Sequence, residues 1–194
     1  KHWLHLAESG LKGEHNLLNG AIAAAVASII GVTNDQIIEG LKAFEPLPHR
    51  LEKVTTVKGV LYVDDSYATT PESAMAALTA FDESAVWIGG GSTKGADFTE
   101  LARAINESSV RAALLLGQEA SKIAQALKKI APRISVEICP SLSEVVARAG
   151  ELARPGEVVL LSPACASKDM FTNAAERGQQ FQDLVKKNAN LQTP

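Results

Sequence analysis

Short apolar runs alternate with alanine-rich segments of helical length from about residue 60 to residue 187. A run of four or five apolar residues has the length of a buried strand, and the segments between the runs are long enough for helices. This alternation predicts a mainly parallel sheet covered by helices, because parallel neighbours need a crossover connection. The expected strands are residues 60–63, 85–88, 112–116, 135–138 and 158–161, and the expected helices are residues 71–80, 98–106, 119–130, 142–153 and 174–187.

The first fifty residues do not follow this alternation. Residues 15–30 and 34–44 have the character of two consecutive helices. Thr33 with Gln36 has the spacing of a capping box at the start of the second one. These helices therefore belong to a different structural unit from the expected sheet.

A short proline-containing stretch separates the two parts. The sequence Glu45-Pro46-Leu47-Pro48 cannot continue a helix. We therefore expect one domain in residues 1–47 and another in residues 48–194. The second begins with two apolar segments on either side of Lys58-Gly59, which predict a β-hairpin.

Composition excludes several classes of function. The 194 residues carry a net charge of -3, so the chain offers no basic surface for nucleic acid. The longest apolar run, residues 21–30, is shorter than the ~20 residues that cross a bilayer, and no leader is visible, so we expect no membrane insertion. Cys139 and Cys165 stand far apart, which supports neither a disulfide framework nor a metal site. Both are expected to be buried thiols in a reducing cytoplasm.

A glycine-rich loop, residues 89–97, follows the expected strand 85–88. Glycines at a strand-to-helix turn let backbone N–H groups approach an anion. The loop matches neither common phosphate motif, because Lys94 stands where the dinucleotide pattern needs glycine and the chain has no Gly-Lys pair. Lys94 nevertheless lies where ligands bind in open α/β sheets, beyond the carboxyl end of a strand. The alternative is a tight turn that binds nothing.

Two other polar loops follow strands of the same expected sheet. Asp64, Asp65 and Thr69 come after residues 60–63, where carboxylates can hold ribose hydroxyls or a metal and threonine can donate to an anion. Ser167 with Lys168 follows the last strand and suits a carboxylate. Since the carboxyl ends of parallel strands share one edge, the loops predict a common anion-binding crevice. The alternative reading is polar turns and a helix cap.

Two further candidates precede the sheet. Asn16 and Asn19 are three residues apart on one helical face, an unfavourable choice in an alanine-rich helix unless the amides bind something. His49-Arg50 adds a planar cation suited to phosphate. A structural hydrogen-bonding role is the alternative for each.

Taken in order along the chain, these motifs resemble those of the Mur ligases. The Ser162-Pro163-Ala164-Cys165-Ala166-Ser167 string, continued by Glu176-Arg177-Gly178, is similar to that of the members that add D-glutamate. The resemblance runs from about Gly13 to Lys187. Its other motifs are Gly13-Glu14-His15-Asn16-Leu17-Leu18-Asn19, Leu47-Pro48-His49-Arg50, Asp65-Ser66 with Ala68-Thr69, Gly89-Gly90 with Lys94 and Asp97-Phe98, and Asp169 with Phe171.

The resemblance implies a Rossmann-like carboxyl-terminal domain that binds an amino acid, preceded by the helical end of a central ATP-binding domain. The implied reaction, in peptidoglycan precursor synthesis in the bacterial cytoplasm, phosphorylates the carboxylate of UDP-N-acetylmuramoyl-L-alanine with ATP. The amine of D-glutamate then attacks the acyl phosphate. By matching position, Asn16, Asn19, Arg50 and Asp65 serve ATP, and Thr69, Lys94, Ser167 and Phe171 bind D-glutamate.

The family's P-loop, uridine-nucleotide domain and magnesium ligands have no counterpart in these residues. We therefore expect no metal ligands here and no ligase activity from the chain alone. Two positions depart from the family pattern, since Tyr67 replaces a lysine and Ala174 replaces a phenylalanine. The competing interpretations are another ligase of the superfamily, such as a folylpolyglutamate synthetase, and a non-catalytic module that binds a nucleotide or an amino acid.

Overall fold

The computed structural model of the chain describes residues 14–44, 47–93 and 95–191. The chain separates into two compact units, Lys1–Pro46 and Leu47–Pro194. Among the described residues, no helix combines the length and the apolar character that crossing a membrane requires.

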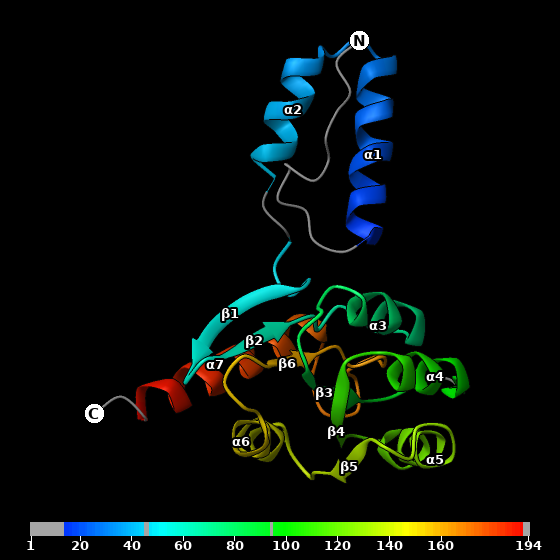
Figure 1. Cartoon of the computed structure of the whole chain (residues 1–194), viewed down its shortest axis with the longest axis vertical. Helices are drawn as coiled ribbons and strands as arrows, with labels where there is room; N and C mark the ends of the chain where they lie inside the picture. The colour runs from blue at the N-terminus through cyan, green and yellow to red at the C-terminus, as the bar shows by residue number, and fades with distance from the viewer. Residues whose placement is uncertain (1–13, 45–46, 94, 192–194) are drawn as a thin grey trace. The chain divides into compact units, whose positions relative to one another are not determined.

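The described part of the first unit is a pair of helices, α1 (Glu14–Ile29) and α2 (Asn34–Lys42), which lie side by side (Figure 1). The predicted capping box is confirmed, because the Thr33 hydroxyl accepts from the Gln36 N–H and the Gln36 side chain accepts from the Thr33 N–H. One side of α1 carries exposed apolar side chains at helical spacing, namely Leu18, Ile22, Val26 and Ile29.

The second unit is built on a sheet that comprises six strands within the described residues, in the order β1-β2-β6-β3-β4-β5. β1 pairs with β2 in antiparallel fashion, and the other neighbouring pairs are parallel. The mainly parallel α/β fold is therefore confirmed. The strands are β1 (Glu52–Val57), β2 (Val60–Asp64), β3 (Ala85–Gly90), β4 (Val110–Leu116), β5 (Ser135–Ile138) and β6 (Val158–Leu161).

The predicted hairpin joins β1 to β2. Lys58 and Gly59 have φ angles of 48° and 79°, the positive values that a two-residue type I′ turn needs.

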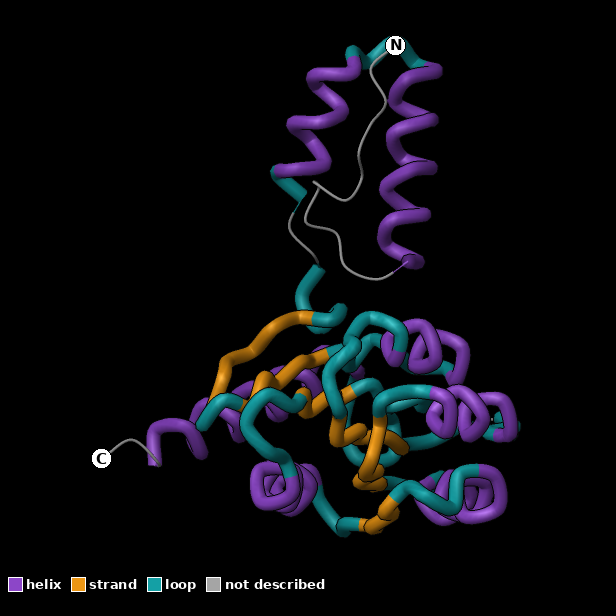
Figure 2. The backbone as a smooth tube through the Cα atoms, in the orientation of Figure 1, coloured by secondary structure: helices purple, strands orange, loops and turns teal. Residues whose placement is uncertain are grey.

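Helices cover both faces of the sheet (Figures 1 and 2). Three of those described pack on one face and two on the other. Their limits lie within two residues of the predicted ones, except that α7 continues four residues further. The first group is α3 (Pro71–Leu78), α4 (Thr99–Glu107) and α5 (Ala120–Ile130), and the second is α6 (Leu142–Leu152) and α7 (Ala174–Leu191).

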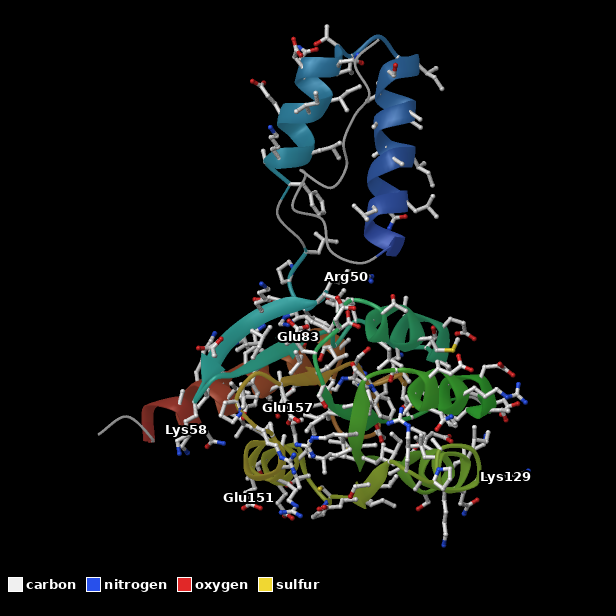
Figure 3. All side chains as sticks on the ribbon, in the orientation of Figure 1. Arg50, Lys58, Glu83, Lys129, Glu151 and Glu157 are labelled. Carbon is white, nitrogen blue, oxygen red and sulfur yellow. The ribbon has the colours of Figure 1, made fainter. Side chains whose placement is uncertain are left out.

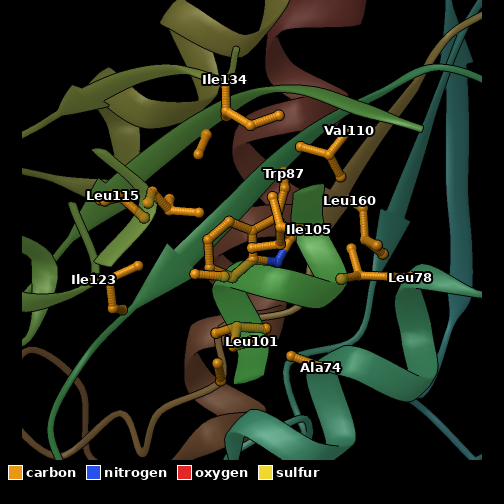
Figure 4. Close-up of a cluster of buried hydrophobic side chains, with 14 of the residues drawn as sticks. Ala74, Leu78, Trp87, Leu101, Ile105, Val110, Leu115, Ile123, Ile134 and Leu160 are labelled. Carbon is orange, nitrogen blue, oxygen red and sulfur yellow. The ribbon is translucent and has the colours of Figure 1, made fainter. Parts of the chain in front are cut away.

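Trp87 lies at the centre of the core between the sheet and α3, α4 and α5 (Figure 4). Its side chain is fully buried, whereas its neighbours Val86 and Ile88 point to the opposite face, as alternation along a strand requires. The indole Nε1 donates to the Ser162 carbonyl over 2.8 Å. This bond ties the core to the loop that follows β6.

Gly89 lies against the Trp87 ring. A Cβ at this position would lie 2.2 Å from the nearest ring carbon, so only glycine fits without a shift of the indole.

Gly89→Ala is expected to lower the free energy of unfolding of the second unit by roughly 1–3 kcal/mol, because the added methyl overlaps an enclosed ring. Urea unfolding, followed by Trp87 fluorescence in a Trp3→Phe background, measures the change. Gly40→Ala in α2 is the matched control, since nothing lies within 4 Å of its Cβ position. An unchanged midpoint for Gly89→Ala would show that the ring can move aside.

Candidate functional site

Three loops meet at the carboxyl edge of the parallel strands. β6 pairs with both β2 and β3, and Leu161 is aligned with Asp64 on one side and with Ile88 on the other. The described residues that follow these strands, 65–70, 91–93 with 95–98, and 162–173, therefore leave the sheet side by side. This edge is where ligands bind in open α/β folds.

Hydrogen bonds join the three loops to one another. The Ser162 hydroxyl donates to Asp65 Oδ2 over 2.8 Å, which links the loops after β6 and β2. Ser92 and Ala166 exchange backbone hydrogen bonds of 2.8 and 3.0 Å, which link the loops after β3 and β6. Gly91 sits at this crossing with a φ of 134°, and a Cβ there would lie 2.2 Å from the Ala166 carbonyl oxygen. The glycine-rich loop thus serves close backbone packing.

Arg177, on α7, forms hydrogen bonds to two of these loops. The residue is 1% exposed, and its guanidinium donates to the Ser66 carbonyl over 2.8 Å and to the Cys165 carbonyl over 3.1 Å. Burial lowers the pKa of this arginine to about 10, so it stays protonated at neutral pH. By contrast, burial raises the pKa of the Cys165 thiol to about 12, which excludes it as a thiolate nucleophile at neutral pH.

Asp65 is a buried carboxyl in the loop that follows β2. Burial raises its pKa to about 6, and the charge of Asp64 acts in the same direction. The bonds from the Ser162 hydroxyl and the Leu51 N–H oppose this rise. Asp65 is therefore poised to change its charge just below neutral pH.

The residues predicted to bind the amino acid fall in two of the three loops. Thr69 is half-buried beyond β2, and Ser167 is buried beyond β6. Phe171 is half-buried against the α6 and α7 side of the sheet and lines a surface cavity of about 480 Å³ with Ser141 and Lys187. Lys94 lies outside the described residues.

The residues predicted to serve ATP divide between the two units. Arg50 lies where the chain enters β1, at the opposite end of the hairpin from Lys58 (Figure 3). The Leu51 N–H, next to Arg50, donates to Asp65 Oδ1 over 3.3 Å, so these two candidates lie in adjoining segments. Asn19 is exposed on α1, and the Asn16 side chain lies outside those described.

One group within the described residues has the spacing of a metal site. Ligand atoms of His49, Glu52 and Asp64 lie within 4.8 Å of one another. The Gln182 amide nitrogen, however, lies 3.0 Å from both carboxylates, and His49 Nδ1 lies 2.7 Å from Asp64 Oδ2. The cluster is satisfied by its own hydrogen bonds, so it needs no cation.

Other polar atoms at this edge lack a partner within the described residues. These buried atoms are Ser66 Oγ, Asp169 Oδ1 and Arg177 Nε, and each belongs to a loop at the edge or to the helix beneath it. Unpaired buried polar groups are typical of places where water or a polar ligand binds.

Two further residues shape this edge: Asp169, which the sequence indicates only through the family resemblance, and Gln182, which no sequence pattern indicated. Asp169 Oδ2 accepts from the Gln118 N–H over 2.9 Å and so links the loop after β6 to the turn after β4. Gln182 joins α7 to the segment that carries Arg50. The only available signal for Gln182 was Gly178, one helical turn earlier, whose missing side chain marks a close approach.

Comparison with known proteins identifies the family. The model of the Mur ligase, glutamate ligase domain, matches residues 49–165. A UDP-N-acetylmuramoylalanine–D-glutamate ligase of Thermobifida fusca is 45% identical over 181 residues, or 91% of this chain. Its counterpart in Salinibacter ruber is 44% identical over 178 residues, or 92% of this chain. The chain spans 38% of the length of each of these curated relatives.

Solved structures show the same fold at low sequence identity. The UDP-N-acetylmuramate-alanine ligase of Thermotoga maritima superposes with a TM-score of 0.68 at 17% identity, over 92% of this chain and 39% of that one. The folylpolyglutamate synthase of Mycobacterium tuberculosis, complexed with ADP, also gives 0.68 at 19% identity, over 88% and 41% of the two chains. Since the family model matches more than half of its residues, the chain belongs to the Mur ligase family and contains the glutamate ligase domain.

Proposed function

We propose that this chain is the part of an ATP-dependent ligase that binds D-glutamate and helps to hold ATP. The observation that carries the proposal is the junction of three hydrogen-bonded loops at one sheet edge, in a chain more than 40% identical to D-glutamate ligases. The complete ligase, meaning this chain together with the rest of the relatives' length, would act in the bacterial cytoplasm on peptidoglycan precursors.

The proposed reaction has two steps. In the first, a carboxylate oxygen of UDP-N-acetylmuramoyl-L-alanine takes the γ-phosphoryl group of ATP, which forms an acyl phosphate and releases ADP. In the second, the neutral amine of D-glutamate attacks the acyl carbon, the new C–N bond forms, the C–O bond to phosphate breaks, and the amine loses a proton. Such chemistry depends on positioning and on stabilising the charge of the moving phosphoryl group.

The nucleotide role rests on Arg50 and Asp65, with Asn16 and Asn19 from the first unit. Arg50 offers a planar cation for phosphate. Asp65, when ionised, has lone pairs beyond those used by Ser162 and Leu51 and can accept from a ribose hydroxyl. The exposed apolar side of α1 fits the proposal that residues 1–47 end a larger ATP-binding domain, because such a face is normally packed against other parts of a core.

The amino-acid role rests on Thr69, Lys94, Ser167 and Phe171. D-Glutamate brings two carboxylates and an amine, so its recognition needs a cation together with several hydrogen-bond donors. The hydroxyls of Thr69 and Ser167 supply donors, and Lys94 supplies the charge. Phe171 is included because its position matches the family motif, and its side chain lines the separate cavity beside α7.

Magnesium accompanies ATP in the implied chemistry. The His49, Glu52 and Asp64 group does not fit this ion, because magnesium prefers six oxygen ligands and this group contains an imidazole bonded to one of the carboxylates. We therefore assign no metal ligand within the described residues, and no step above runs through one.

A folylpolyglutamate-type ligase is the second candidate, because such a synthase shares the fold. The amino-acid and acceptor preferences of the complete ligase distinguish the two: D-glutamate with UDP-N-acetylmuramoyl-L-alanine, or L-glutamate with a folate. A non-catalytic binding module would support neither reaction.

Lys94→Ala in the complete ligase is expected to raise the KM for D-glutamate about ten- to a hundredfold, since a hydrogen bond to a charged group is worth roughly 1.5–3 kcal/mol. The KM for ATP should stay nearly unchanged, because other residues are proposed to hold the nucleotide. Steady-state phosphate release at varied D-glutamate and varied ATP measures both constants. Lys128→Ala, on the exposed face of α5, is the matched control. An equal rise in both constants would contradict the assignment.

The Asp65 carboxyl is expected to give kcat/KM for ATP an acid limb near pH 6, because its raised pKa makes it neutral below that value. Ser162→Ala should move this limb to higher pH, since the lost hydrogen bond favoured the ionised form. Ser109→Ala is the control, because its hydroxyl bonds the Glu83 carbonyl away from Asp65.

The same pKa has a consequence for stability. Because it lies above the ordinary value of 3.8, folding takes up a proton between about pH 4 and 6. The contribution of Asp65 to the free energy of unfolding therefore falls as pH rises through that window, and Asp65→Asn removes this dependence.

The activity profile has its own contradicting outcome. If the acid limb of kcat/KM stays at the same pH in both Asp65→Asn and Ser162→Ala, Asp65 is not its source.

A further inference from the structure

Arg50 is flanked by two residues with positive φ angles, a backbone conformation that is energetically unfavourable for residues other than glycine. His49 and Leu51 have φ angles of 61° and 48°. Residues in this region are held there by their surroundings. The His49 N–H donates to Glu52 Oε2 over 2.7 Å, and the Leu51 N–H donates to Asp65 Oδ1 over 3.3 Å. The direction in which Arg50 leaves the main chain therefore depends on these two carboxylates.

The His49 ring anchors the same segment to α7. Nδ1 lies 2.7 Å from Asp64 Oδ2, and because the carboxylate accepts, Nδ1 carries the hydrogen. Gly178 of α7 packs directly against this pair: a Cβ would lie 2.3 Å from Nδ1 and 2.7 Å from Oδ2. The absence of a side chain at residue 178 allows the helix to approach.

Gln182, one turn further along α7, completes the anchor. Its amide nitrogen lies 3.0 Å from Asp64 Oδ2 and 3.0 Å from Glu52 Oε2, so its two hydrogens have two acceptors. The 3.4 Å contact with His49 Nδ1 joins two donors and is therefore no hydrogen bond. Gln182 is 5% exposed, and it connects the carboxylate that holds the His49 ring to the one that holds the His49 N–H.

The Tyr67 ring contacts the guanidinium end of the Arg50 side chain. The guanidinium carbon lies 5.4 Å from the centroid of the Tyr67 ring, a cation–π arrangement. The Tyr67 N–H also donates to the His49 carbonyl over 3.2 Å, so this residue contacts both the side chain and the segment that carries it. A lysine at position 67, as in the motif that the sequence resembles, would place a second cation beside Arg50.

We propose that Gln182 and Tyr67 are positioning residues for Arg50: Gln182 fixes the backbone from which it extends, and the Tyr67 ring fixes its guanidinium. The proposal rests on the proposed function, in which Arg50 contacts a phosphate of ATP. A cation held in place before binding loses less conformational freedom on binding. Loss of either residue therefore weakens ATP binding selectively.

Kinetics of the complete ligase test the functional part. Gln182→Leu keeps the side-chain size but removes the donor, and it should raise the KM for ATP about tenfold. Tyr67→Leu should raise the KM for ATP about two- to fivefold. Tyr67→Phe, which keeps the ring, should retain most of the affinity for ATP. In all variants the KM for D-glutamate should change less than twofold. Gln179→Leu is the matched control on the same helix, because that side chain is exposed and bonds Asp183.

Proton NMR of this 194-residue chain tests the geometry without catalysis. The ring current of Tyr67 should shift the Arg50 side-chain protons upfield. The shift should disappear in Tyr67→Leu, persist in Tyr67→Phe and shrink in Gln182→Leu, in which the backbone of residue 50 is released.

The two readouts separate the possible outcomes. A selective rise in the KM for ATP together with the changed Arg50 shift supports the proposal. An unchanged KM for ATP, or equal rises for ATP and D-glutamate, overturns it, and Tyr67→Leu decides the matter should Gln182→Leu fail to fold. An unsubstituted ligase that makes no ADP in response to D-glutamate contradicts the proposed function instead, and the NMR comparison still tests whether the two residues hold Arg50.

Discussion

The arrangement of the loops at the carboxyl edge of the parallel strands depends on the hydrogen bonds of the buried Arg177 guanidinium. A charge taken out of water is costly unless hydrogen bonds compensate it. Here the compensation comes from the carbonyl groups of Ser66 and Cys165, in the loops after β2 and β6. The guanidinium therefore fixes two loops to α7 at once. The Ser162–Asp65 bond and the backbone exchange between Ser92 and Ala166 then extend the same framework to the loop after β3.

The framework also explains why residues remote in sequence act together. β6 is the last strand of the sheet, yet it lies between β2 and β3. The Ser162–Asp65 bond consequently joins residues 97 positions apart, and the bonds from Gln182 to Asp64 and Glu52 join residues 118 and 130 positions apart. A continuous polar network thus runs from α7 to the start of β1, where Arg50 lies.

Local patterns in the sequence predicted the local structure well. Thr33 caps its helix, and the Lys58-Gly59 turn closes its hairpin, because each depends on chemistry within a few residues. The strand order was not predictable in this way, since pairing of β6 with β2 and β3 depends on packing of the whole sheet. Likewise the sequence placed Thr69, Ser167 and Asp65 in loops at strand ends, but the partnership of Gln182 with Asp64 arises only from the approach of α7 at Gly178.

We propose that the junction of the three loops binds D-glutamate, and a crystal structure of the complete ligase with D-glutamate tests this most directly. The carboxylates of the ligand are expected within about 3 Å of the Thr69 and Ser167 hydroxyls and of the Lys94 ammonium. D-Glutamate bound instead in the cavity lined by Ser141, Met170 and Lys187, with no ligand at the loop junction, would contradict it.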